Sequence, residues 1–129
     1  MKKFTIFEIA KLLNFNDQEI KDIETDYKAS DEAKRCETMD IFYDSYFELL
    51  DKLAKIKYNQ FMEEASEGKR ELKTDLYQQA KRAVWTDFEN ILAGKPQEVD
   101  QLDEIRNKLK NFTQGAISKN STSVTTPAH

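Results

Sequence analysis

Histidine and cysteine are almost absent from this chain of 129 residues. The one histidine is His129, in a polar tail, and the one cysteine is Cys36. Catalytic triads, Cys–His dyads, HExxH zinc sites and the Glu-x-x-His pattern of di-iron bundles all need a histidine placed within the fold. A single cysteine forms no internal disulfide, and without a Cys/His cluster it holds no structural zinc. We therefore expect no enzymatic activity, no metal and no cofactor.

Glycine, proline and long hydrophobic runs are also scarce, with only 3 glycines and 2 prolines. Few helix breakers, and no alternation of apolar and polar residues over the length of a strand, favour helices over sheets. No segment approaches the roughly 20 apolar residues of a membrane span. Glu8 and Lys11 interrupt the apolar stretch that a signal peptide would need. We expect one all-α domain, cytoplasmic and without a membrane partner.

Charge is abundant and unevenly distributed. Residues 1–68 carry 10 Lys and Arg against 16 Asp and Glu, a balance of −6, and residues 69–129 carry 10 against 8, a balance of +2. An acidic first half disfavours non-specific contact with nucleic acid or an anionic membrane. It suits a basic partner surface, although solubility alone explains it equally well.

Capping residues predict where the first three helices begin. Thr5 is followed three residues later by Glu8, and Asn16 by Glu19. In such a capping box each side chain binds the backbone N–H group of the other residue. Ser30, followed by two acidic residues, is typical of the start of a third helix. The expected helices cover about 6–14, 17–28 and 31–67, with one continuous helix over 17–67 as the alternative.

Glycines predict the helix ends in the rest of the chain. Gly68, Gly94 and Gly115 are placed as C-terminal caps, and Pro96 suits the first position of a helix. Two further helices are expected over about 70–93 and 96–114. The resulting architecture is a single all-helical domain over 1–115, with a helical hairpin at 5–29 and a three-helix antiparallel bundle at 31–114. The Ser/Thr-rich residues 116–129 are expected to be a disordered tail.

The helix over residues 39–62 is apolar around an unusually large part of its circumference. Each residue of a helix advances by about 100°, so its apolar positions cover roughly half of the surface. A helix with that face needs two neighbours or a second copy of the chain, which makes a homodimer plausible. The positions are Met39, Phe42, Tyr43, Tyr46, Phe47, Leu49, Leu50, Leu53, Ala54, Ile56, Tyr58 and Phe61.

Residues 8–23, EIAKLLNFNDQEIKDI, resemble the helix-turn-helix motif of bacterial transcription regulators. Ala10 takes a close-packing position, Asn14 stands where that motif usually has glycine, and Ile20 takes an inward position. Asn tolerates the left-handed backbone conformation that the turn needs. The resemblance implies DNA binding through the second helix, whose exposed residues would nonetheless be mostly acidic, with no arginine to read guanine. A tightly capped helical hairpin with a structural role is the competing interpretation, and we favour it.

Four carboxylates line one side of the predicted long helix: Asp40, Asp44, Glu48 and Asp51. Such a row could bind a divalent cation or a basic partner. One helix cannot surround a metal, however, and Glu48–Lys52 and Asp51–Lys55 are ordinary compensating pairs. We favour a solvated face.

One more carboxylate, Asp87, falls within the apolar stripe of the helix over 70–93, where an unpaired charge would be costly. Lys57 interrupts the facing stripe, but a hairpin that turns at Gly68 would offset the two residues by about 10 Å. We therefore expect a hydroxyl of Tyr43 or Tyr46 to bind Asp87 as a buried polar contact, with a ligand pocket as the alternative. The expected apolar stripe itself is Leu72, Leu76, Ala80, Ala83, Val84 and Ile91.

Trp85 lies off that stripe. If exposed, and bordered by Lys81, Arg82 and Glu89, it would be a good anchor for a protein partner. Packing under the last helix is the alternative. We therefore expect a non-enzymatic interaction protein, an adaptor, small regulator or assembly factor that binds another protein or itself. The partner surfaces to consider are Trp85, Arg82 and Glu89, and the acidic row. A transcription-linked DNA-binding regulator that uses residues 8–23 is the alternative.

Overall fold

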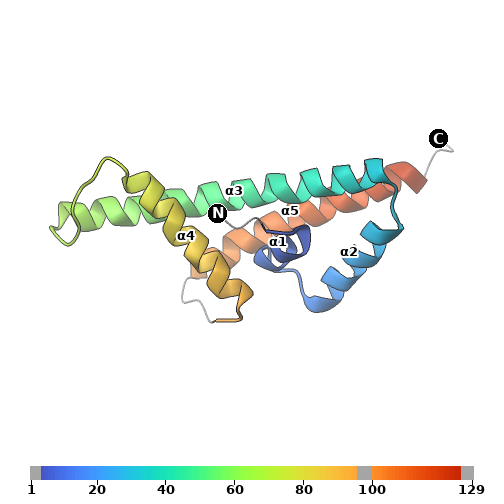
Figure 1. The fold of residues 1–129 in the computed structure, drawn as a ribbon, viewed down its shortest axis with the longest axis horizontal. Helices are drawn as coiled ribbons and strands as arrows, with labels where there is room; N and C mark the ends of the chain where they lie inside the picture. Colours follow the sequence, from blue (N-terminus) through green and yellow to red (C-terminus); the bar gives the residue numbers. More distant parts are fainter. Residues whose placement is uncertain (1–3, 96–99, 126–129) are drawn as a thin grey trace. The chain divides into compact units, whose positions relative to one another are not determined.

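Five α-helices form the fold of residues 4–95 and 100–125, which the structure, a computed structural model, describes (Figure 1). No residue in these ranges lies in a strand, so the all-α prediction is confirmed. The contacts divide the chain into two compact units, Met1–Tyr46 with Asp100–His129, and Phe47–Val99. The single domain over 1–115 stays a prediction. The helices are α1 (Ile6–Leu12), α2 (Asp17–Ala29), α3 (Glu32–Ser66), α4 (Leu76–Leu92) and α5 (Asp100–Thr125).

Both predicted capping boxes are present. The Thr5 hydroxyl accepts a hydrogen bond from the Glu8 backbone N–H group at 3.1 Å, and the Glu8 carboxylate accepts one from Thr5 at 2.9 Å. Asn16 and Glu19 make the same exchange at 2.8 and 2.9 Å. α1 ends two residues earlier than predicted, because Asn14 adopts the left-handed conformation, with φ of 69°.

The chain breaks between α2 and α3, so the continuous helix over 17–67 does not form. Ser30 is extended, and the Asp31 carboxylate accepts a hydrogen bond at 2.8 Å from the backbone N–H group three residues later. Asp31 therefore caps the start of α3. Arg35, one turn into α3, donates to the carbonyls of Tyr27 and Lys28 at 3.0 and 2.8 Å. These carbonyls belong to the last turn of α2, where the Tyr27 carbonyl also accepts from the Ser30 N–H group at 3.2 Å.

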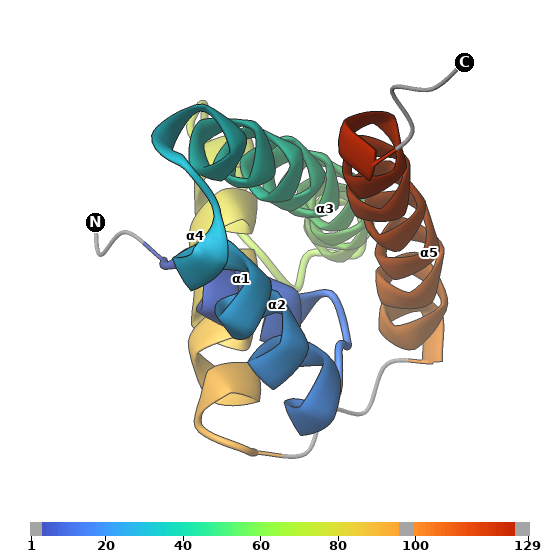
Figure 2. The same cartoon turned by 90° about the vertical axis from the view of Figure 1, so that its right-hand side faces the viewer.

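In the first unit, α5 runs beside the first part of α3, α1 lies against both helices, and α2 leads from the hairpin turn to the start of α3 (Figures 1 and 2). The ring of Phe15, in the turn between α1 and α2, lies 6.0 Å from the ring of Phe42 on α3. Ser45 of α3 and Thr113 of α5 share a buried hydrogen bond of 2.6 Å. Of the apolar positions predicted on the helix over 39–62, Phe42 and Tyr46 are buried in this unit, whereas Met39 and Tyr43 are half-buried. The fully buried side chains include Ile9, Leu12, Leu13, Phe42, Ser45 and Thr113.

The second unit contains the rest of α3, a loop over 67–75, and α4. α4 begins at Leu76 rather than at residue 70, because the chain folds back after Gly68, whose φ is 77°. The Lys69 N–H group donates to the Glu64 carbonyl at 2.8 Å, which ends α3 as a Schellman motif. Phe61, Leu76 and Ala80 form a buried cluster under this turn. Leu72, which we predicted to be buried, is exposed because it lies in the loop.

α5 continues through Gly115 to Thr125, so the prediction of a helix that ends near residue 114 was wrong. Glycine ends a helix when it takes a positive φ, as Gly68 and Gly94 do, and Gly115 does not. Residues 116–125 of the predicted disordered tail are therefore helical. The predicted role of Pro96, and the last four residues of the tail, lie outside the described residues.

Candidate interaction surfaces

The acidic row on α3 is exposed as predicted. Asp40, Asp44 and Glu48 lie on successive turns of one continuous helix, and all three are exposed. The two compensating pairs form, with Lys55 at 3.1 Å from Asp51 and Lys52 at 3.8 Å from Glu48. Within the described residues, neither Asp40 nor Asp44 makes an ion pair with a lysine or arginine. The net negative charge of the row is therefore concentrated at its N-terminal end.

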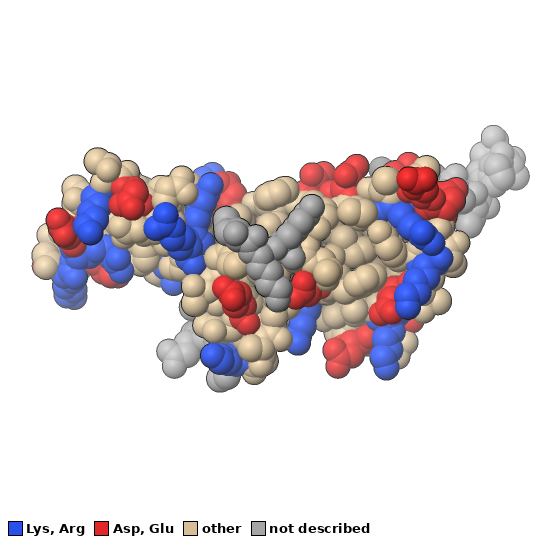
Figure 3. Space-filling view, in the orientation of Figure 1, with Lys and Arg blue, Asp and Glu red and all other residues tan. Residues whose placement is uncertain are grey.

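An aromatic side chain stands within this row. Phe47 is 60% exposed, three residues after Asp44 and four before Asp51. Residues at these spacings are neighbours on a helix surface. The sequence placed Phe47 on the half of the helix expected to be buried. We call Asp40, Asp44, Phe47, Glu48 and Asp51 the Phe47 surface. Acidic side chains also gather along the edge of the molecule that follows the first half of α3 (Figure 3).

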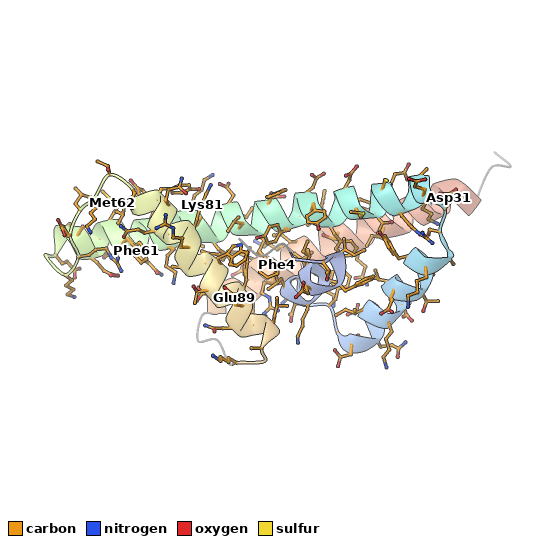
Figure 4. The ribbon with its side chains drawn as sticks, in the orientation of Figure 1. Phe4, Asp31, Phe61, Met62, Lys81 and Glu89 are labelled. Carbon is orange, nitrogen blue, oxygen red and sulfur yellow. The ribbon has the colours of Figure 1, made fainter. Side chains whose placement is uncertain are left out.

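The second predicted surface lies on α4. Arg82 and Glu89 are exposed and Trp85 is half-buried, so Trp85 is not the fully exposed anchor that one of the two interpretations requires. The role of these residues as a partner surface stays a prediction. Figure 4 shows Lys81 and Glu89 on this helix. The Lys81 ammonium lies 5.2 Å from the centre of the Tyr77 ring, and the Tyr77 hydroxyl donates to the Asp51 carboxylate at 3.2 Å. This side of α4 is therefore engaged with α3 within the second unit.

Asp87 pairs with Lys57, at 3.6 Å, and the prediction of a tyrosine partner was wrong. Two assumptions behind that prediction fail. α4 starts six residues later than expected, and it crosses α3 obliquely rather than running alongside it (Figures 1 and 2). The side chains of Asp87 and Lys57 are 36% and 28% exposed, so this is a surface ion pair and not a buried contact. Such pairs contribute roughly 0–1 kcal/mol.

The two tyrosines proposed for Asp87 both contact Phe4 instead. The Tyr43 hydroxyl donates to the backbone carbonyl of Phe4 at 2.9 Å. The ring of Tyr46, which is buried, meets the Phe4 ring edge to face at 5.8 Å. Phe4, labelled in Figure 4, precedes α1. These contacts hold the start of the chain against α3 in the first unit.

The hairpin formed by α1 and α2 is bound along its turn by polar side chains of α5. Arg106 donates to the carbonyls of Leu12 and Lys11 at 2.6 and 2.9 Å, and so caps the C-terminal end of α1. Burial lowers the pKa of the Arg106 guanidinium, and the Asp103 carboxylate at 3.3 Å offsets part of this effect. No local pattern around Arg106 indicates this role, because the two carbonyls lie 94 and 95 residues earlier in the chain.

Three further contacts attach the hairpin to α5. Asn14 donates to Asn107 at 2.8 Å. Glu19 accepts from Lys110 at 2.9 Å and from Gln114 at 3.1 Å, in addition to its role in the capping box. The outer side of α2 carries mostly acidic or neutral residues, of which Asp17, Gln18, Lys21, Asp22 and Asp26 are exposed. The resemblance to a helix-turn-helix motif would place α2 against DNA. The outer side of α2 therefore exposes carboxylates where DNA would bind.

Glu19 makes the attachment of the hairpin sensitive to acid. Its pKa is lowered from 4.5, first by the Asn16 N–H group and then by the Lys110 ammonium, while partial burial opposes the shift. The stability that Glu19 contributes is present above pH 4.5 and is lost as the pH falls through the lowered value. We expect Glu19→Gln to lower the free energy of unfolding at pH 7. At pH 3 the free energies of unfolding of the variant and the wild type should be closer together. Urea unfolding across this range measures the difference.

Glu24→Gln is the matched control, because it removes a carboxylate of α2 that pairs only with the exposed Lys28. The difference in free energy of unfolding between Glu19→Gln and the wild type could also stay constant from pH 7 to pH 3. That result would show that the Glu19 contacts do not make stability depend on pH.

The described residues contain neither a metal-binding cluster nor a membrane-spanning helix. In residues 4–95 and 100–125, no group of three or more His, Cys, Asp or Glu side chains is arranged to hold a metal ion. In the same residues, no helix has the length and apolar character to cross a membrane. Comparison of the chain with protein-family models, with curated proteins and with solved structures finds no match.

Proposed function

We propose that this protein is a non-enzymatic helical interaction module, an adaptor, small regulator or assembly factor, that binds a partner protein through the Phe47 surface of α3. The observation that carries the proposal is the 60% exposure of Phe47 within a row of carboxylates. Burying a phenylalanine side chain contributes about 2 kcal/mol. Aromatic anchors bordered by polar residues dominate the binding energy of many interfaces.

The charge of this surface favours a foreign partner over a second copy of the chain. Two copies that met symmetrically through this face would bring their carboxylate rows together, and like charges across an interface cost free energy. We therefore expect light scattering to give a monomer over a wide range of protein concentrations. A dimer that dissociates on Phe47→Ala would contradict this expectation.

Selection from a displayed library of helical peptides tests the proposed function. The full chain, its Phe47→Ala variant and its Phe112→Ala variant serve as parallel targets. Phe112 on α5 is 66% exposed, which makes it a matched control for the loss of an exposed ring. We expect peptides that bind the wild type and Phe112→Ala but not Phe47→Ala. Failure to enrich any peptide, or enrichment indifferent to Phe47, contradicts the proposal.

Binding of duplex DNA through α2 is the competing function, and the carboxylates on the outer side of α2 oppose it. We expect no binding of a mixed-sequence duplex even at low salt, measured by fluorescence anisotropy. Binding that falls steeply as salt increases, and that Lys21→Glu abolishes, would favour the regulator instead.

A further inference from the structure

We infer that the partner segment at the Phe47 surface is a cationic amphipathic helix, an inference that rests on the proposed function and adds the chemistry of the partner. Three features support it: the shape of the apolar strip around Phe47, the absence of free backbone groups along the middle of α3, and the position of the carboxylates without ion pairs.

The apolar strip is short and runs along the helix axis. Tyr43 precedes Phe47 by one turn and Leu50 follows it by one turn, and both are half-buried. From Tyr43 to Leu50 the strip rises by seven residue steps, or roughly 10 Å of helix. Side chains spaced three and four residues apart on a second helix repeat over the same length, so such a helix can place two or three apolar residues against this strip.

The backbone of α3 favours a helical partner over an extended one. Phe47 lies well inside Glu32–Ser66, where N–H and C=O groups bond to one another along the helix. An extended peptide would find no edge to pair with, and its own backbone groups would lose water without gaining partners. A helix satisfies these groups internally.

The charges near Phe47 require cations on the partner. Glu37, Asp40 and Asp44 are exposed and make no ion pair with a cation among the described residues. Glu48 and Asp51 are partly neutralised by Lys52 and Lys55. Lys or Arg residues on the partner therefore belong beside the part of α3 that precedes Phe47. They add specificity and speed of association more than affinity.

A second copy of the chain offers a poorer match. Among the residues that the structure describes, Phe112 is the other strongly exposed phenylalanine. It lies on α5 near Lys108, but Lys108 pairs with Glu104 at 3.6 Å. The region around Phe112 therefore supplies an aromatic ring without net positive charge. We accordingly commit to a separate cationic segment as the occupant.

The test uses two labelled synthetic peptides that differ only in charge, an amphipathic helix of Leu and Lys and its counterpart of Leu and Glu. Fluorescence anisotropy measures the binding of each to the full chain. We expect only the Leu/Lys peptide to bind. Phe47→Ala should weaken this binding about tenfold or more. Asp40→Asn with Asp44→Asn should weaken it roughly three- to tenfold and reduce its salt dependence. Phe112→Ala should leave it unchanged.

The outcomes separate this inference from the function on which it rests. Equal binding of both peptides, or binding of the Leu/Lys peptide that Phe47→Ala does not weaken, overturns the inference. If the displayed library gives Phe47-dependent peptides that are neutral or acidic, the proposed function stands and the cationic helix is wrong. If no library peptide binds, both fail. Circular dichroism of each variant establishes that it is folded, and the paired Asp→Asn changes test the charge without altering the core.

Discussion

Arg106→Ala should destabilise the protein by about 3 kcal/mol, which is large for a residue that is neither apolar nor catalytic. The side chain is 9% exposed, and two of its nitrogens donate to carbonyls in the last turn of α1. Removing it leaves the Leu12 carbonyl in a partly closed site without this donor, whereas the Lys11 carbonyl keeps the backbone N–H group of Asn14 at 3.0 Å. The substitution also removes the aliphatic stem that fills the space. Chemical unfolding at neutral pH measures the loss as a lower denaturant midpoint.

Arg35→Ala is the matched control for this prediction. Arg35 donates to the last-turn carbonyls of α2 in the same manner, but its side chain is exposed, so water can replace it. We expect a loss of about 1 kcal/mol. If both variants lose the same stability, burial does not distinguish the two caps and our account of Arg106 is wrong.

Phe42→Ala should lower the free energy of unfolding by about 4 kcal/mol, the middle of the range for a buried aromatic residue. Phe42 has no exposed surface and packs against Phe15 of the hairpin turn, so its removal leaves a cavity between α3 and the hairpin. Phe47→Ala, five residues later on the same helix, should change stability by about 0.5 kcal/mol or less, because the side chain is mostly exposed.

Thermal and urea unfolding of the two variants test this contrast directly. A large loss of stability in Phe47→Ala would mean that Phe47 serves the fold. The Phe47 surface would then no longer be available as a binding surface, and the proposed function would lose its main support. A small loss in Phe42→Ala would contradict the observed core of the first unit.

Local sequence signals were sufficient for the starts of α1 and α2. The capping boxes at Thr5 and Asn16 act between residues three apart, and the left-handed conformation of Asn14 depends on its own backbone and side chain. The acidic row on α3 followed for the same reason, since helix periodicity alone places Asp40, Asp44 and Glu48 on adjacent turns.

Signals that depend on a neighbour were less reliable. Gly68 and Gly115 are the same residue type, yet only Gly68 takes a positive φ and ends a helix. After Gly68 the chain folds back, and the Arg70 guanidinium lies 3.7 Å from the centre of the Phe61 ring while pairing with Glu64. These contacts hold the loop after α3, so residues 69–75 do not join α4. No pattern of neighbouring residues in the sequence predicts these contacts.

The sequence by itself determined that this protein is helical, where α1 and α2 begin, and which residues share a face of each helix. These properties follow from backbone geometry and contacts within a few residues. Only the tertiary structure decided which part of each apolar face is covered. It paired Asp87 with Lys57, buried Arg106 against α1, and left Phe47 exposed. Burial depends on the angle and register at which helices meet, and these are set by the packing of residues far apart in the chain.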